Sequence, residues 1–119
     1  AGATPFALTG SAGAGNTAIQ LTVPAVVGKV PYFWISITGG GASAASVVDV
    51  TVTNTSAGTA IFNYGAAAGA GVPNTPLREP PAGSPPIQGV AANTACVVTC
   101  PALGNGNTKN NVNIFGYYL

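Results

Sequence analysis

The sequence predicts an all-β chain that folds as a β-sandwich of jelly-roll or Greek-key type. Apolar residues do not recur with a helical period, whereas short runs alternate apolar and polar side chains along the whole chain. Clusters of Gly, Pro, Asn and Ser, which favour turns, separate these runs, and the chain holds 17 glycines and 10 prolines. Some runs are apolar on both faces, so we expect two sheets packed face to face.

The alternation predicts about seven or eight short antiparallel strands. The clearest is the run 47–53, in which three valines face inward while Asp49 and Thr51 face outward. Residues 54–58 are expected to form its hairpin turn. Glycines at 39–41 predict a flexible break, and residues 101–111 a long turn. The other expected strands cover residues 18–23, 29–37, 59–64, 87–91, 94–100 and 111–119.

The length of 119 residues corresponds to one domain. We expect a single sandwich domain over residues 18–119. Residues 1–17 are predicted to form an extended N-terminal arm, in which Phe6 and Leu8 are the only large apolar side chains. Six prolines within residues 73–86 predict a surface loop, because proline cannot donate a hydrogen bond to a sheet.

Charged residues make up only 4% of the chain, with a net charge of +1, against about 25% in an ordinary soluble domain. Nucleic-acid binding requires clustered Lys or Arg side chains, and attraction to a membrane surface requires a polybasic patch. The three dispersed basic residues provide neither feature. We therefore expect no nucleic-acid partner and no membrane partner.

Titratable side chains are too few for ordinary catalysis. The only carboxylates are Asp49 and Glu79, and the chain has no histidine. Cys96 and Cys100 would lie about 13 Å apart within one strand, too far for a disulfide between them, and are expected to be small buried apolar residues. Pairing of either cysteine across chains stays open. We expect no enzyme activity, no metal site and no cofactor.

Aromatic residues gather in three clusters, at 32–34, at 62 and 64, and at 115, 117 and 118. Neighbouring aromatic residues in a strand point to opposite faces, so one face fills the core and the other needs a second cover. Another subunit could supply it, or the sandwich could cover both faces itself. The predicted subunit or capsid interface comprises Phe6, Leu8, Tyr32, Trp34, Pro76, Leu77, Arg78, Tyr117 and Tyr118.

The stretch from Pro73 to Arg78 also matches the PxxPxR form of an SH3 ligand. Such ligands usually occur in disordered tails, whereas this stretch lies between predicted strands. Its position favours a structural loop, or an arm that grips a neighbouring molecule.

The C-terminal third carries a family resemblance. The segments ANTACVVTCP at 92–101, GNGNT at 104–108 and FGYYL at 115–119 resemble small virion proteins of tailed bacteriophages. The two cysteines and Phe115 depart from the usual texture. The resemblance implies a jelly-roll subunit that decorates or cements the outside of a DNA-filled capsid. Its partners would be copies of itself, as a homotrimer, and the major capsid protein, in a virion assembled from subunits made in the host cytoplasm.

Two other classes of function share the predicted fold. One is an adhesin, fibre or tail-surface subunit, which would also be a weakly charged β-sandwich. The other is a carbohydrate-binding module, whose stacking side chains would be drawn from Tyr32, Trp34, Tyr64, Tyr117 and Tyr118. Sugar sites usually add carboxylates or a calcium ion, and acidic residues are scarce here.

Overall fold

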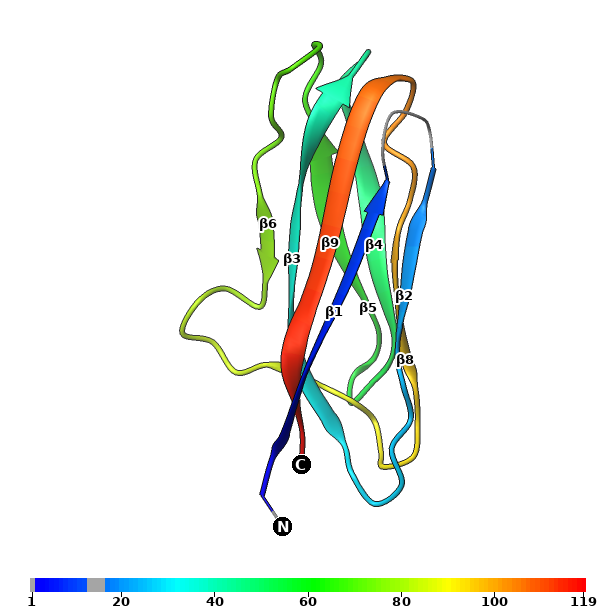
Figure 1. Ribbon diagram of the computed structural model, residues 1–119, viewed down its shortest axis with the longest axis vertical. Coiled ribbons are helices and arrows are strands. Elements are labelled where there is room, and N and C mark those ends of the chain that lie inside the picture. The colour runs from blue at the N-terminus through cyan, green and yellow to red at the C-terminus, as the bar shows by residue number, and fades with distance from the viewer. Residues whose placement is uncertain (1, 13–16) are drawn as a thin grey trace.

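The computed structural model describes residues 2–12 and 17–119, and within them the chain forms nine strands and no helix. The strands make two antiparallel sheets that face each other in an elongated molecule of 48 × 25 × 22 Å (Figure 1). The predicted β-sandwich is therefore confirmed. The strands are β1 (Thr4–Ala12), β2 (Ile19–Val23), β3 (Pro31–Ala42), β4 (Ser46–Thr55), β5 (Gly58–Ala66), β6 (Leu77–Glu79), β7 (Ile87–Gln88), β8 (Cys96–Cys100) and β9 (Gly106–Tyr118).

The strand order is that of a jelly roll. One sheet, sheet A, has the order β1-β9-β3-β6, with β7 also paired to β3, and the other, sheet B, has the order β2-β8-β4-β5. The pairs are nested along the chain: β1 with β9, β2 with β8, β3 with β6 and β7, and β4 with β5. This is the pattern of one long hairpin rolled into two sheets. It brings the first and last strands side by side in sheet A (Figure 1).

The core lies between the two sheets and follows the period-two alternation of the strands. In β3, Phe33, Ile35 and Ile37 are fully buried, while the residues between them are half-buried. In β4, Val50 and Val52 are fully buried, which confirms the predicted orientation of this strand. A strand with one apolar face must bury that face, so these side chains fix which side of each sheet is outside.

The expected N-terminal arm is wrong for residues 4–12, which form β1 at the edge of sheet A. Phe6 and Leu8 are partly buried and pack against the core, because they lie opposite Gly116 and Ile114 of β9 and share their inward face. Residues 1 and 13–16 of the expected arm lie outside the described residues. The alternation of β1 is weak in the sequence, since its other inward positions are Gly10 and Ala12.

Two expected breaks are also strands. The glycines at 39–41 continue β3 to Ala42, and the long turn expected at 101–111 ends at Gly106, where β9 begins. The cause is tertiary, because β3 and β9 pair along almost their full length, including Gly39 with Asn110. Gly41, at a φ of 88°, lies at the irregularity that shifts the register of this pair.

The proline-rich segment 73–86 is only partly the loop that the sequence predicts. Leu77–Glu79 forms β6, which pairs with the edge of β3. The following residues, 80–86, which we call the proline loop, leave the sheet and project away from the body of the sandwich before β7 (Figure 1). Ile87 then returns to the core opposite Phe33.

Candidate functional site

Four aromatic side chains lie on the outer surface of sheet A, and we call this surface the aromatic face. They are Tyr32 and Trp34 of β3 and Phe115 and Tyr117 of β9. The register places Tyr32 opposite Tyr117 and Trp34 opposite Phe115. All four are half-buried, and none belongs to the core, because they alternate with its inward residues.

The four rings stack against one another across the two strands. The centroids of Tyr32 and Tyr117 are 5.3 Å apart, with an angle of 18° between the rings. Those of Trp34 and Phe115 are 6.0 Å apart at 13°, and Trp34 also contacts Tyr117 in a tilted arrangement at 6.4 Å. Such pairs add roughly 0.5–1.5 kcal/mol each beyond the burial of their area, so the face is a preformed platform.

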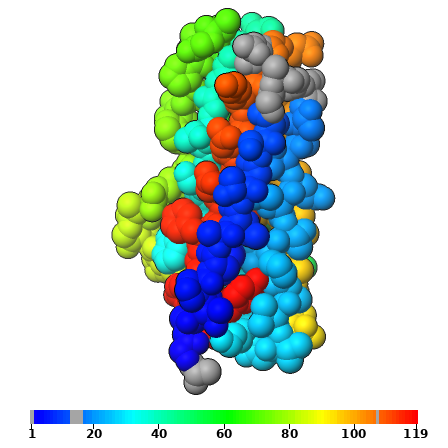
Figure 2. All heavy atoms as spheres, in the orientation of Figure 1, coloured from blue at the N-terminus to red at the C-terminus, as the bar shows by residue number. Residues whose placement is uncertain are grey.

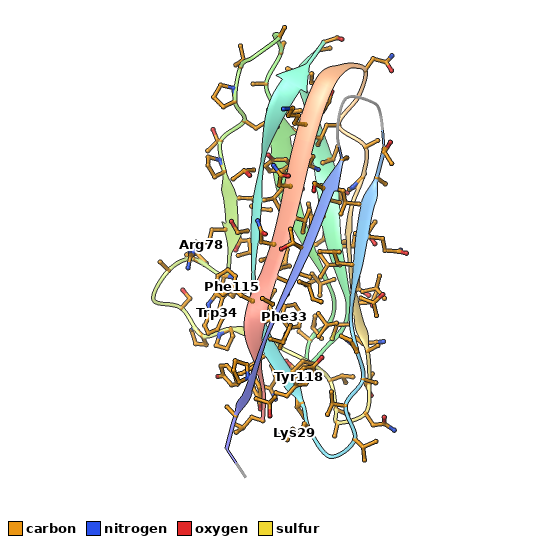
Figure 3. The ribbon with its side chains drawn as sticks, viewed as in Figure 1. Lys29, Phe33, Trp34, Arg78, Phe115 and Tyr118 are labelled. Carbon is orange, nitrogen blue, oxygen red and sulfur yellow. The ribbon has the colours of Figure 1, made fainter. Side chains whose placement is uncertain are left out.

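Arg78 completes one end of the aromatic face. It lies in β6, opposite Ser36 of β3, and its guanidinium carbon is 5.4 Å from the centroid of Phe115. This distance is within the range of a cation–π interaction. Figure 3 shows Arg78, Phe115 and Trp34 next to one another, beside the proline loop.

Gly116 explains how closely the two strands approach beneath the rings. It stands between Phe115 and Tyr117 and faces the core, opposite Phe33. A Cβ atom at this position would collide with the backbone oxygen of Tyr32 and with the Cα and Cβ atoms of Phe33. The missing side chain therefore lets the backbone of β9 lie directly against that of β3 at Tyr32 and Phe33.

The structure brings together four of the predicted interface residues and separates the others. Tyr32, Trp34, Arg78 and Tyr117 share the outer surface of sheet A. Pro76 is exposed in the connection just before β6. The remaining predicted residues face the core: Phe6, Leu8, Leu77 and Tyr118.

Tyr118 is a structural residue and has almost no surface to offer a partner, because only 6% of it is exposed. Its hydroxyl donates a hydrogen bond of 2.8 Å to the backbone oxygen of Pro24, and its ring lies 4.8 Å from that of Phe6. Burial raises the pKa of this phenol above its ordinary value. Tyr64 is buried as well and is hydrogen-bonded to Asn74. Two of the five side chains considered for sugar stacking are therefore in the core.

Phe115 is the member of the aromatic face that the predicted interface lacks. The signal that finds it is the period of two in β9, where Phe115 and Tyr117 must share a face. Tyr118, the neighbour of Tyr117, must then point to the opposite side.

Both cysteines are free thiols that are fully buried in the core. Burial raises the pKa of each thiol, so both are protonated at neutral pH. The amide nitrogen of Asn110 lies 3.2 Å from the sulfur of Cys100. The expectation of two small buried apolar residues at 96 and 100 is confirmed.

Elsewhere, the described part of the chain forms surface pockets but no metal-binding cluster. Among residues 2–12 and 17–119, no three His, Cys, Asp or Glu side chains are placed to share a metal ion. A cavity of about 370 Å³ lies away from the aromatic face and is lined by Gly39, Gly40, Val72, Pro73 and Lys109, mostly through backbone and apolar atoms. In the same described residues, no helix has the length and apolarity needed to cross a membrane.

Comparisons with known proteins leave the aromatic face as the main guide to function. A scan against models of protein families gives no match. A search of curated protein sequences gives none either.

Proposed function

We propose that this chain is a structural subunit of a virion, which decorates or cements the outer surface of a DNA-filled capsid. It binds there to copies of itself, as a homotrimer, and to the major capsid protein. The aromatic face is the observation that carries this proposal. Four stacked rings on one outer sheet surface, in a chain with only five charged residues, make a surface suited to burial against another protein.

Two further features support the same function. The jelly-roll strand order is common among capsid proteins, although many unrelated functions share it. The low charge suits a subunit that binds a symmetric lattice, because many weak apolar contacts give strong attachment by avidity without charged anchors. The resemblance of the C-terminal third to phage virion proteins points in the same direction.

The proposal is tested on particles of the virus that encodes the chain. Particles made with and without the gene are purified, the copy number of the chain is measured by mass spectrometry, and the temperature of DNA release is compared. We expect many copies per particle in a fixed ratio to the major capsid protein, and DNA release at a lower temperature without the chain. Added purified protein should restore the higher temperature.

The alternatives predict other results from the same particles. A few copies located at the tail would contradict decoration and favour a tail or fibre subunit. Complete absence from the particles would contradict any virion role.

A carbohydrate-binding module is tested on the purified protein instead, and would show a saturable change in Trp34 fluorescence on titration with soluble oligosaccharides. Trp34 is the only tryptophan, so such a signal would come from the aromatic face itself.

A further inference from the structure

We propose that the aromatic face of one subunit binds the proline loop, residues 80–86, of a second copy of this chain. The inference rests on the homotrimer of the proposed function and identifies the contact that builds it. The two surfaces differ, so the contact is heterologous, and successive contacts close a ring of three subunits.

The proline loop has the structure of a preformed ligand. The backbone N–H of Ser84 donates a hydrogen bond of 3.0 Å to the oxygen of Pro81, and Gly83 has a φ of 87°. These are the features of a type II turn with glycine at its third position. Prolines at 80, 81, 85 and 86 restrict the backbone on both sides. The loop therefore loses little conformational entropy when it docks.

The tip of the loop is unused within its own subunit. Pro81, Ala82, Gly83 and Pro85 are all exposed, and the loop projects from the side of the molecule (Figure 2). The four rings of the aromatic face are half-buried, mainly against one another, and their outer surface is open because sheet B packs on the opposite side of sheet A. The aromatic face and the proline loop are thus two apolar surfaces that have no partner within the subunit, and each is a suitable partner for the other.

The two surfaces are complementary in hydrogen bonding. A proline-rich segment has backbone carbonyl acceptors but few N–H donors, and aromatic surfaces are the usual partners of such segments. The aromatic face and its edge provide donors from the Trp34 indole, the Tyr32 and Tyr117 hydroxyls and Arg78. Within the part of the chain that the structure describes, none of these donors has a hydrogen-bond partner.

The charge balance also favours this occupant. Residues 80–86 carry no charged side chain, and neither do the four aromatic residues. The one neighbouring cation, Arg78, is already held over Phe115. Docking therefore takes no charged side chain of residues 80–86 out of water, and Arg78 keeps its contact with Phe115, whereas a charged partner would meet no opposite charge on the four rings themselves.

The experiment uses two variants of the full chain that each remove one side of the contact. The face variant is Trp34→Ser with Tyr117→Ser, and the loop variant is Pro81→Ser with Pro85→Ser. The control variant is Ile61→Ser, which removes an apolar side chain that is 60% exposed in β5 of the other sheet. Circular dichroism and thermal unfolding establish that each variant folds. Light scattering and sedimentation velocity then measure mass from about 1 to 100 µM.

We expect the wild type and the control to be trimers, and each double variant to be a monomer with association weakened by about 30-fold or more. A one-to-one mixture of the two double variants should form a heterodimer, because the intact loop of one fits the intact face of the other. In the wild type, dilution should shift Trp34 emission to longer wavelength. In the loop variant, the emission should already be that of the monomer at every concentration.

Three results would overturn the inference. One is a wild type that is monomeric up to 100 µM, and another is a loop variant that stays trimeric. The third is a mixture of the double variants that fails to pair, because an intact loop and an intact face would then not bind each other. The virion role is measured separately on particles, so its failure is distinguishable from the failure of the loop contact. A monomeric wild type that still restores DNA retention would keep the virion role but contradict both the homotrimer and the loop contact.

Discussion

The alternation of side chains along a strand, more than the residue type, decides which residues belong to the candidate site. The predicted interface included both Tyr117 and Tyr118, which are neighbours in one strand and so cannot share a face. Counting by two from the outward Tyr117 leads to Phe115, and counting by two from the outward Tyr32 leads to Trp34. The sequence is therefore sufficient to tell which aromatic residues share a face within each strand. It is not sufficient to tell which of the two faces is outside, because both carry aromatic residues.

The buried thiols lead to a prediction about alkaline pH. Burial raises the pKa of Cys96 and Cys100 in the folded state above the ordinary value of about 8.5. Above that pH the unfolded chain loses protons that the folded chain keeps, so the free energy of unfolding falls as pH rises. We expect stability to be level below pH 8 and to decline by as much as about 1.4 kcal/mol per pH unit and thiol above pH 8.5. Urea denaturation monitored by Trp34 fluorescence measures the free energy of unfolding at each pH.

The matched variant for this measurement is Cys96→Ala with Cys100→Ala. It is less stable at every pH, because both side chains are fully buried, but its stability should decline less between pH 8.5 and 9.5. Burial raises the pKa of Tyr64 and Tyr118 as well, but both proteins contain these tyrosines, so their contribution cancels in the comparison. An equal decline in the variant and the wild type would contradict the assignment to the thiols.

Among the elements, β1 shows the clearest contrast between local pattern and final structure. Taken alone, residues 4–12 are weakly apolar and rich in small side chains, which is typical of an arm. In the folded chain they pair with β9 in nine register positions, from Thr4 with Tyr118 to Ala12 with Asn110. The partner residues lie between 98 (Ala12 to Asn110) and 114 (Thr4 to Tyr118) positions away in sequence. The sequence of an extended arm and that of an edge strand have the same pattern, and only the position of the partner strand β9 distinguishes them.

The substitution Leu8→Ala distinguishes a strand from an arm. Leu8 faces inward opposite Ile114 and packs against the core, so we expect its truncation to lower the free energy of unfolding by about 1–2 kcal/mol. The control is Ala7→Ser, because Ala7 is exposed on the outer surface of the same strand. Its stability should stay within about 0.5 kcal/mol of the wild type. Urea denaturation compares the free energies of unfolding of the two variants. Equal stability would indicate that residues 4–12 form an arm and not a strand.

For the whole molecule, the dominant property is the near absence of charge. Five charged residues are spread over a sandwich 48 Å long, so neither sheet surface has a strong field. Association through such surfaces depends on apolar contact and on uncharged hydrogen bonds. Both are screened by salt much less than exposed ion pairs are.

Salt dependence therefore tests the character of the subunit contact. Between about 0.05 and 0.5 M NaCl we expect the dissociation constant of the trimer to change by less than about threefold. Sedimentation equilibrium at both salt concentrations measures this dissociation constant. The control variant Ile61→Ser should show the same weak dependence on salt. A tenfold or larger weakening at high salt would show that ion pairs involving Arg78 or the lysines hold the subunits together.

The amino-acid sequence was sufficient for the fold class, for the hairpin at 54–58 and for the inward valines of β4, because period-two alternation and turn residues act locally. It was also sufficient to anticipate that both cysteines are buried and not bonded to each other. The edge strand β1, the continuation of β3 through its glycines and the early start of β9 were settled by pairing between distant strands. A segment with weak local preference becomes a strand where a neighbouring strand edge can satisfy its backbone hydrogen bonds. The aromatic face exists for the same reason, since only the pairing of β3 with β9 brings its four rings together.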